Sequence, residues 1–168
     1  MRRQDRKVSD PATIRNILDS AQVFHLAILD PASPAPYVIP LNFGYELEGS
    51  TLRLFFHGAL AGRKYDLLKN GPHSAGFALD CGHELVLGRE SQHTTYVYRS
   101  LIGEGIVRQL VETEEKRRGL EILMACLTKK PCHVSDGTLA VTAVYVLEVE
   151  RFEAKQNLPK REAEEEGK

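Results

Sequence analysis

The amino-acid sequence predicts a small, mainly antiparallel β-barrel with peripheral α-helices. Segments with strand periodicity outnumber helical segments, roughly seven to three. Short turns connect several of these strands, and hairpin connections produce antiparallel sheets. Several strands are also long enough to bend, and such sheets close on themselves because closure removes unpaired edges. Periodicity alone leaves an α+β sandwich open as the alternative.

Length and composition indicate a single globular domain. The chain has 168 residues, of which 42% are hydrophobic and 27% charged, and it is long enough to enclose a core. A net charge of −1 gives no basic footprint for nucleic acid. No apolar run follows the charged start MRRQDRKVSD, so neither a signal peptide nor a membrane span is expected. Cys81, Cys126 and Cys132 are far apart and odd in number, which predicts reduced thiols in a cytoplasmic protein.

The first half of the chain predicts one helix followed by three strands. Asp10 suits the N-cap of the helix, and Pro11 suits its first turn. Pro40 lies within a stretch of strand period, but it cannot donate a ladder hydrogen bond, so we expect it at an edge or a bulge. The expected elements are a helix over 9–21 and strands over 23–30, 37–46 and 51–57, the last two forming a hairpin.

The second half predicts four more strands, a helix and a polar tail. Gly103 and Gly105 mark a bulge or a sharp bend within a long strand. The C-terminal stretch contains almost nothing apolar, so residues 1–155 are predicted as one domain and 156–168 as a disordered tail. The expected elements are strands over 73–80, 83–87, 94–110 and 138–152 and a helix over 112–130.

The stretch FFHGALAGRKYDLLKNGP places a positive charge where an apolar side chain is expected. It predicts a strand, a loop of small residues and a helix, and Lys64 falls on the same helical stripe as Leu67 and Leu68. Lysine is almost never fully buried without a partner. With Arg63 beside it and a helix N-terminus at the loop, this pattern indicates a phosphate site. The alternative is that the stem of Lys64 covers apolar surface while its amine stays in water.

Other candidate groups carry weaker signals. His57 ends the strand before this loop, where it is either a ligand contact or a simple surface histidine. If the expected hairpin pairs, Pro40 and Asn42 line the same pocket as His57. The stretches CGH (81–83) and CH (132–133) lack the spacing of zinc ligands, so no metal site is predicted. The sequence contains neither a GxGxxG motif nor a Walker loop.

The motifs PYVIPLNFGYE, LRLFFHGALAGRKYDLLKNGP and YRSLIGEG together resemble the pyridoxamine 5′-phosphate oxidase-related flavoproteins, and more closely their nitroimidazole-resistance (Nim-like) branch. The resemblance implies an FMN-binding split β-barrel that forms a homodimer, with FMN at the dimer interface. The chain lacks the basic strand motif of pyridoxamine phosphate oxidase itself, so that activity is not expected. It also has His93, Thr94 and Thr95 where Nim-like relatives often show a cysteine and an aromatic residue.

The resemblance also implies which residues hold the cofactor. Carried onto this sequence, Arg63 and Lys64 would bind the FMN phosphate, and His57 and Gly58 would lie near one edge of the isoalloxazine ring. Ser100, within YRSLIG, is a further expected cofactor-binding residue. The residues expected along the ring are Pro40, Leu41, Asn42 and Phe43.

The activity implied by this resemblance is electron transfer from a reduced nicotinamide, NAD(P)H, through the flavin to a small-molecule electron acceptor such as a nitroaromatic compound. His57 is the candidate catalytic residue, because a histidine titrates near neutral pH and can orient or protonate the acceptor. The alternatives are a non-catalytic flavin-binding or storage protein, a split barrel that binds haem or a deazaflavin, and an interaction module without a ligand.

Overall fold

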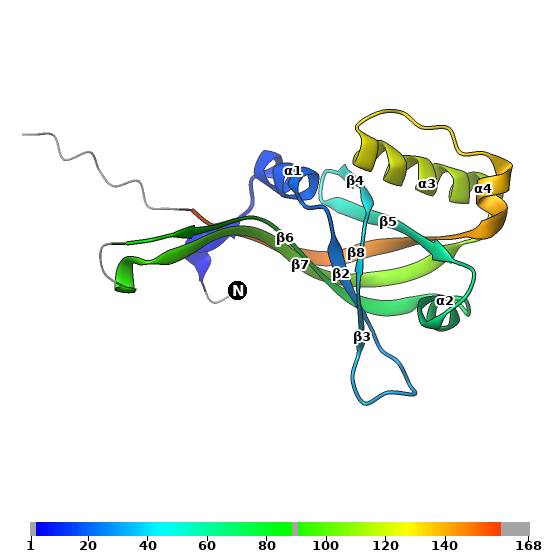
Figure 1. Ribbon diagram of the computed structural model, residues 1–168, viewed down its shortest axis with the longest axis horizontal. Coiled ribbons are helices and arrows are strands. Elements are labelled where there is room, and N and C mark those ends of the chain that lie inside the picture. The colour runs from blue at the N-terminus through cyan, green and yellow to red at the C-terminus, as the bar shows by residue number, and fades with distance from the viewer. Residues whose placement is uncertain (1–2, 89–90, 159–168) are drawn as a thin grey trace, which may run out of the picture.

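The structure is a computed structural model that describes residues 3–88 and 91–158, and it contains one bent antiparallel sheet with helices around it (Figure 1). The strands are β1 (Lys7–Val8), β2 (Phe24–Ile28), β3 (Tyr37–Leu41), β4 (Gly44–Glu48), β5 (Thr51–Ala59), β6 (His73–Val86), β7 (Thr95–Leu110) and β8 (Thr142–Asn157). The helices are α1 (Pro11–Ser20), α2 (Arg63–Leu68), α3 (Thr113–Thr128) and α4 (Asp136–Val141), with short 3-10 helices η1 (Gln4–Arg6) and η2 (Ser91–His93). Among the described residues, no helix combines the length and apolarity that a membrane crossing requires.

Several predicted elements are confirmed. The side chain of Asp10 accepts a hydrogen bond from the backbone N–H of Thr13 and caps α1, with Pro11 in the first turn. The long strand β7 forms as expected, and its pairing with β8 shifts register between Glu104 and Gly105. The predicted bulge is therefore present, because an extra residue on β8 is accommodated at this glycine.

One extended segment closes the sheet into a barrel. The strand order is β3-β2-β6-β7-β8-β5-β4, and β1 pairs with the C-terminal part of β8. The two end strands, β3 and β4, are consecutive in sequence, and only Asn42 and Phe43 separate them. The segment therefore pairs first with β2 and then with β5. The prediction of one continuous strand over 37–46 is wrong at this junction, and the hairpin forms between β4 and β5 only.

Away from the junction the barrel is split. Within the described chain, β3 pairs only with β2, and β5 from Phe56 to Ala59 pairs only with β8. We call the gap between these two unpaired edges the split. Pro40 lies on the edge strand β3, as predicted, where its missing N–H removes no ladder hydrogen bond. The predicted fold class, an antiparallel split β-barrel with peripheral helices, is confirmed.

The second half of the chain departs from the prediction in three places. β6 is one strand instead of two, because the chain continues through a bulge at Gly82, whose φ of +64° suits glycine. The final strand begins at Thr142, because the Ser135 side chain caps the short helix α4 before it. β8 then extends to Asn157, so the predicted tail begins within this strand. Residues 159–168, the rest of the predicted tail, lie outside the described residues.

A series of aromatic rings fills the barrel. Tyr145 stacks on Phe56 at 5.1 Å between ring centroids, Phe56 lies 5.5 Å from Phe24, and Phe24 lies 5.6 Å from Phe43. These buried rings come from β8, β5, β2 and the junction between β3 and β4, so they connect the strands on both sides of the split. The Tyr145 hydroxyl has no hydrogen-bond partner among the described residues, and burial raises its pKa to about 12.

Helix α3 packs against β4 and β5 at very close range. A Cβ atom on Gly44 would lie 2.4 Å from the backbone Cα of Leu123, so the strand and the helix backbone approach each other directly. On the helix, a Cβ atom on Gly119 would lie 2.7 Å from the side chain of Leu110. Glycine is required at both contacts, because any side chain would fill the space that the neighbouring element occupies.

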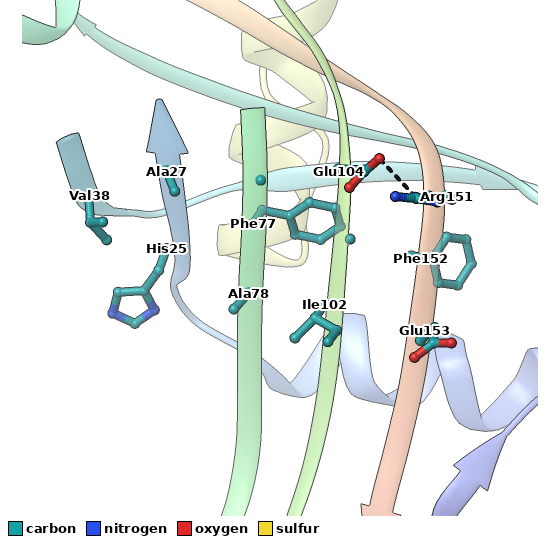
Figure 2. Close-up of a pocket in the computed structure, with 12 residues that line it drawn as sticks. His25, Ala27, Val38, Phe77, Ala78, Ile102, Glu104, Arg151, Phe152 and Glu153 are labelled. Carbon is teal, nitrogen blue, oxygen red and sulfur yellow. Dashed lines mark ion pairs between the residues drawn. The ribbon is translucent and has the colours of Figure 1, made fainter. Parts of the chain in front are cut away.

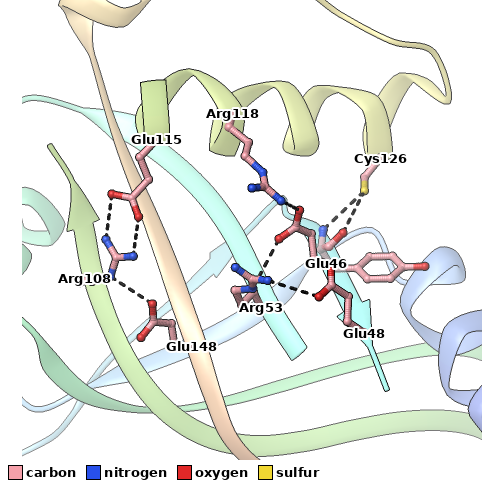
Figure 3. Close-up of polar contacts among 9 residues, drawn as sticks. Glu46, Glu48, Arg53, Arg108, Glu115, Arg118, Cys126 and Glu148 are labelled. Atoms are coloured by element: carbon pink, nitrogen blue, oxygen red, sulfur yellow. Dashed lines mark hydrogen bonds and ion pairs between the residues drawn. The ribbon is translucent and has the colours of Figure 1, made fainter. Parts of the chain in front are cut away.

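Charged contacts fix the same helix at its borders (Figure 3). Arg108 on β7 forms ion pairs with Glu115 of α3 at 2.6 Å and with Glu148 of β8 at 3.2 Å. Arg118 of α3 contacts Glu46 of β4 at 2.7 Å. Such partly exposed pairs contribute modestly to stability, so they mainly fix the orientation of α3 over the sheet.

Replacing Gly44 by alanine should destabilise the fold by about 1–3 kcal/mol, because the added methyl group would overlap the α3 backbone. Gly76→Ala is the matched control, because the nearest atom to its added Cβ lies 3.9 Å away. Urea unfolding followed by circular dichroism measures both. Equal midpoints for Gly44→Ala and the wild type would contradict the close packing described here.

Candidate functional site

The first turn of α2 connects the two sides of the split. Arg63 donates from Nε and Nη2 to one carboxylate oxygen of Asp30, at 2.9 and 2.6 Å, and its guanidinium lies 4.5 Å from the ring centroid of Tyr37. Asp30 follows β2 and Tyr37 begins β3, so Arg63 is held by the β2–β3 side. A hydrogen bond from the Ala32 N–H and the Arg63 contact lower the pKa of Asp30.

Lys64 contacts the other side of the split. Its Nζ donates to the backbone carbonyl of His57 at 2.7 Å and lies 5.9 Å from the ring centroids of both Phe56 and Tyr145. Of the acidic side chains that the structure describes, none forms an ion pair with Lys64. Burial lowers the pKa of Lys64, because desolvation disfavours its charged form. The predicted cation on the core-facing side of α2 is therefore confirmed, whereas a phosphate partner remains a prediction.

Gly58 provides the space for this amine. A Cβ atom on Gly58 would lie 2.4 Å from Nζ and 2.6 Å from Cε of Lys64. The loop that follows reaches α2 through Gly62, whose φ of +94° is accessible mainly to glycine. The small residues of this loop thus let a charged side chain lie against the strand backbone.

His57 faces a pocket on the opposite side of β5. Its backbone carbonyl accepts from Lys64, while its side chain lines a pocket of about 500 Å³ between β5, α3 and α4. We call it the α3–α4 pocket. Desolvation lowers the pKa of His57, and the nearby Lys64 charge lowers it further. The lining residues are His57, Gly58, Ala59, Leu120, Met124, Cys132, His133, Val134, Thr138, Val141 and Thr142.

Most of this pocket was not predicted from the sequence. In the sequence, Cys132 and His133 lack the spacing of zinc ligands and give no other signal of a site. In the described residues, no cluster of three or more His, Cys, Asp or Glu side chains is placed to hold a metal. Thr138 and Val141 belong to a stretch that was expected to be a strand. The one useful signal was His57, which ends β5 beside the small-residue loop.

Two predicted cofactor residues, Pro40 and Ser100, lie on the side of the sheet opposite the aromatic core. We call this side, formed by β3, β2, β6, β7 and β8, the outer face. A hollow of about 700 Å³ lies over this face (Figure 2). Ser100 lies between Asp80 of β6 and Lys155 of β8. Paired residues of neighbouring strands form two further rows across this face. They are Pro40–His25–Ala78–Ile102–Glu153 and Val38–Ala27–Gly76–Glu104–Arg151.

The remaining predicted ring contacts lie at the junction of β3 and β4. Leu41 packs against the core, Phe43 is buried within it, and Asn42 donates to the Gln22 carbonyl at 3.0 Å. Within one chain, Pro40 and Asn42 do not share a pocket with His57, because β3 pairs with β2 and the hairpin assumed for that expectation does not form. Within one chain the structure brings together only the four predicted residues His57, Gly58, Arg63 and Lys64.

The fold places the protein in the class of antiparallel split β-barrels. A family model described as pyridoxamine 5′-phosphate oxidase matches residues 10–156, so the chain belongs to this family. The resemblance inferred from the sequence motifs is therefore confirmed. A comparison with curated proteins finds no match.

Solved structures share this fold over most of their length. A candidate 5-nitroimidazole antibiotic resistance protein from Bacteroides thetaiotaomicron has 28% identity and a TM-score of 0.74, over 89% of this chain and 86% of that chain. The flavocytochrome Anf3 from Azotobacter vinelandii has 22% identity and a TM-score of 0.72, over 94% and 72% of the two chains. An FAD and haem binding protein from Mycobacterium smegmatis has 19% identity and a TM-score of 0.72, over 90% and 73%.

Replacing Lys64 by methionine should raise the pKa of His57, because it removes a nearby positive charge. The pKa should stay below its ordinary value of 6.5, since desolvation is the larger cause of its decrease. NMR titration of the His57 imidazole measures this. Lys69→Met is the control, because Lys69 directly follows α2 and pairs with Asp66. An unchanged or lower His57 pKa in Lys64→Met would contradict the proximity described here.

The same shift predicts the direction of a pH effect on stability. The folded-state pKa of His57 lies below 6.5, so the unfolded chain binds more protons as the pH falls through that value. The contribution of His57 should therefore lower the free energy of unfolding as the pH falls, and by less in Lys64→Met than in the wild type. Urea unfolding at a series of pH values compares the two slopes.

Proposed function

We propose that this protein binds FMN and transfers electrons from a reduced nicotinamide to a small acceptor. The observation that carries the proposal is Lys64, a half-buried ammonium whose described partner is a single backbone carbonyl. An ammonium in this setting favours an anion, because desolvation costs free energy that one neutral acceptor offsets only in part. Membership of the pyridoxamine 5′-phosphate oxidase family supports a flavin as the source of that anion.

The residues at α2 fit a phosphate group. Lys64 would donate to a phosphate oxygen, and Gly58 leaves room for its ammonium against the β5 backbone. Arg63 uses two donors on one oxygen of Asp30, and its side chain is 49% exposed, so the guanidinium retains donors for a second contact. Arg63 would contribute less than Lys64, because Asp30 already neutralises its charge.

A bound flavin would supply the redox chemistry, because it exchanges electrons with both a nicotinamide and a small acceptor. With a nitroaromatic acceptor the balanced reaction is NAD(P)H + H⁺ + R–NO₂ → NAD(P)⁺ + R–NO + H₂O. His57 would orient the acceptor through a hydrogen bond, since its lowered pKa keeps the imidazole neutral at pH 7. The relation to a candidate 5-nitroimidazole resistance protein supports this acceptor class.

A homodimer is part of the proposal. Pro40 and Ser100 lie on the outer face, whereas His57 and Lys64 lie at β5 and α2, so one chain does not unite the predicted cofactor residues. The middle of the outer face carries small and apolar side chains, as Figure 2 shows, and such a surface is typical of a protein interface. A second copy placed on this face would bring the two sets of residues to one site.

Replacing Lys64 by alanine should weaken FMN binding by about 1.5 to 3 kcal/mol, or roughly 10- to 150-fold, as expected for the loss of a charge-assisted hydrogen bond. Quenching of FMN fluorescence measures the dissociation constant. Lys69→Ala is the matched control, because Lys69 directly follows α2 and its ammonium pairs with Asp66. A wild-type protein that neither binds FMN nor oxidises NADH or NADPH would refute the proposed function.

Replacing Ala78 by arginine should disrupt the dimer, because it places a long charged side chain in the middle of the outer face. Val111→Arg is the control, since Val111 is exposed just before α3 and does not line the hollow on this face. Light scattering coupled to size-exclusion chromatography should give a dimer for the wild type and Val111→Arg and a monomer for Ala78→Arg. A monomeric wild type, or a dimeric Ala78→Arg variant, would contradict this arrangement.

A further inference from the structure

We propose that the α3–α4 pocket binds the electron acceptor, and that it selects uncharged, largely apolar aromatic molecules with a polar group directed at His57. This inference rests on the proposed function, because it assigns a substrate class and a location to the acceptor. The observations that carry it are the chemistry of the lining, the contacts that hold the pocket open, and the position of His57 between the pocket and Lys64.

The lining of the pocket carries no fixed charge. Among the described residues that form it, none is Asp, Glu, Lys or Arg. The hollow on the outer face differs, because Glu104, Arg151 and Glu153 contribute to it. No lining side chain carries a fixed charge that could pair with a charged ligand, so the α3–α4 pocket favours uncharged molecules.

The apolar part of the lining suits a planar ring. Leu120 and Met124 project from α3, and Val134 and Val141 lie on the opposite wall. Methionine adapts its shape to a bound ring and makes favourable sulfur–aromatic contacts. A volume of about 500 Å³ is within the range of small-molecule sites, and the imidazole of His57 supplies a directional polar group.

Contacts from α3 hold the opposite wall in place. The Arg117 guanidinium donates to the Val134 carbonyl and forms an ion pair with Asp136 at 2.6 Å. Glu121 accepts from the Val134 N–H at 3.2 Å, and the ammonium of Lys116 donates to a backbone carbonyl of α4. The wall is therefore fixed before any ligand arrives, and a preformed pocket avoids the cost of ordering on binding.

His57 connects this pocket to the cofactor-binding residues proposed above. Its backbone carbonyl contacts Lys64 on one side of β5, and its side chain lines the pocket on the other. Gly58 and Ala59 continue the same wall and carry almost no side chain, so only backbone separates the pocket from the Lys64 ammonium. A ligand in this pocket and an anion at Lys64 would lie on opposite sides of one short stretch of strand.

Tryptophan substitutions that fill the pocket test the location. Met124→Trp should weaken binding of 2-methyl-5-nitroimidazole at least 10-fold, whereas FMN binding should stay within 2-fold. Leu127→Trp is the matched control, because Leu127 lies one turn further along α3, is 45% exposed and does not line the pocket. Val141→Trp is a second variant that fills the pocket. Val141 is 70% exposed, so a larger side chain there does not disturb the core. Calorimetric titration of the purified full-length chain measures both ligands.

Charge discrimination tests the chemical class. The neutral probe 4-nitrobenzyl alcohol should bind the wild type at least 10-fold more tightly than the anion 4-nitrobenzoate. Equal affinities for the neutral and the anionic probe would overturn this inference, and so would probe binding that neither Met124→Trp nor Val141→Trp weakens. If FMN still binds in either case, the proposed function is unaffected. If the wild type binds the neutral probe in this pocket but not FMN, the proposed function and the acceptor role both fail, and only the preference of the pocket for neutral aromatic ligands stands.

Discussion

The architecture depends on how the backbone hydrogen bonds of the barrel are completed. A sheet that closes must pair its last strand with its first, and here one segment over 37–48 serves both ends by pairing with β2 and then with β5. Because β3, before the junction, pairs with β2 and not with β5, the other edge of β3 and the edge of β5 from Phe56 to Ala59 remain unpaired within the described chain. The loop after β5 and the first turn of α2 lie at this opening, so the same constraint that closes the barrel also positions Arg63 and Lys64.

The two cations of α2 are not equivalent, although they are adjacent in sequence. Arg63 is neutralised by Asp30, a carboxylate whose side chain is only 9% exposed, so this pair fixes the β2–β3 side of the split. Lys64 instead bonds a neutral carbonyl beside two buried rings, and desolvation lowers its pKa. Such a site can hold an anion without losing its structure. Lys64 can exchange the His57 carbonyl for the anion, while the Arg63–Asp30 pair keeps α2 attached to the β2–β3 side of the split.

Local patterns predicted what depends on local interactions. The helices α1 and α3, the long strand β7 and the core-facing position of Lys64 followed from periodicity and capping. The sequence did not predict which strand β3 pairs with, because the alternation over 37–46 is identical whether the partner is β2 or β5. The β-branched residues near Thr138 favoured a strand, but the Ser135 cap starts a helix there. The α3–α4 pocket was missed because it combines residues from three distant stretches.

The open edge of β5 explains why a lysine belongs beside it. Unpaired strand edges bind other strands, and proteins protect them with charged side chains, lysine in particular. The hydrogen bond from Lys64 to the His57 carbonyl provides such protection, because it occupies an edge acceptor and places a charge where another strand would have to pack. An anion that draws Lys64 away would expose this carbonyl, so it must cover the edge itself. Under the proposed function, a phosphate carried on a larger planar group would meet that requirement better than a free ion would.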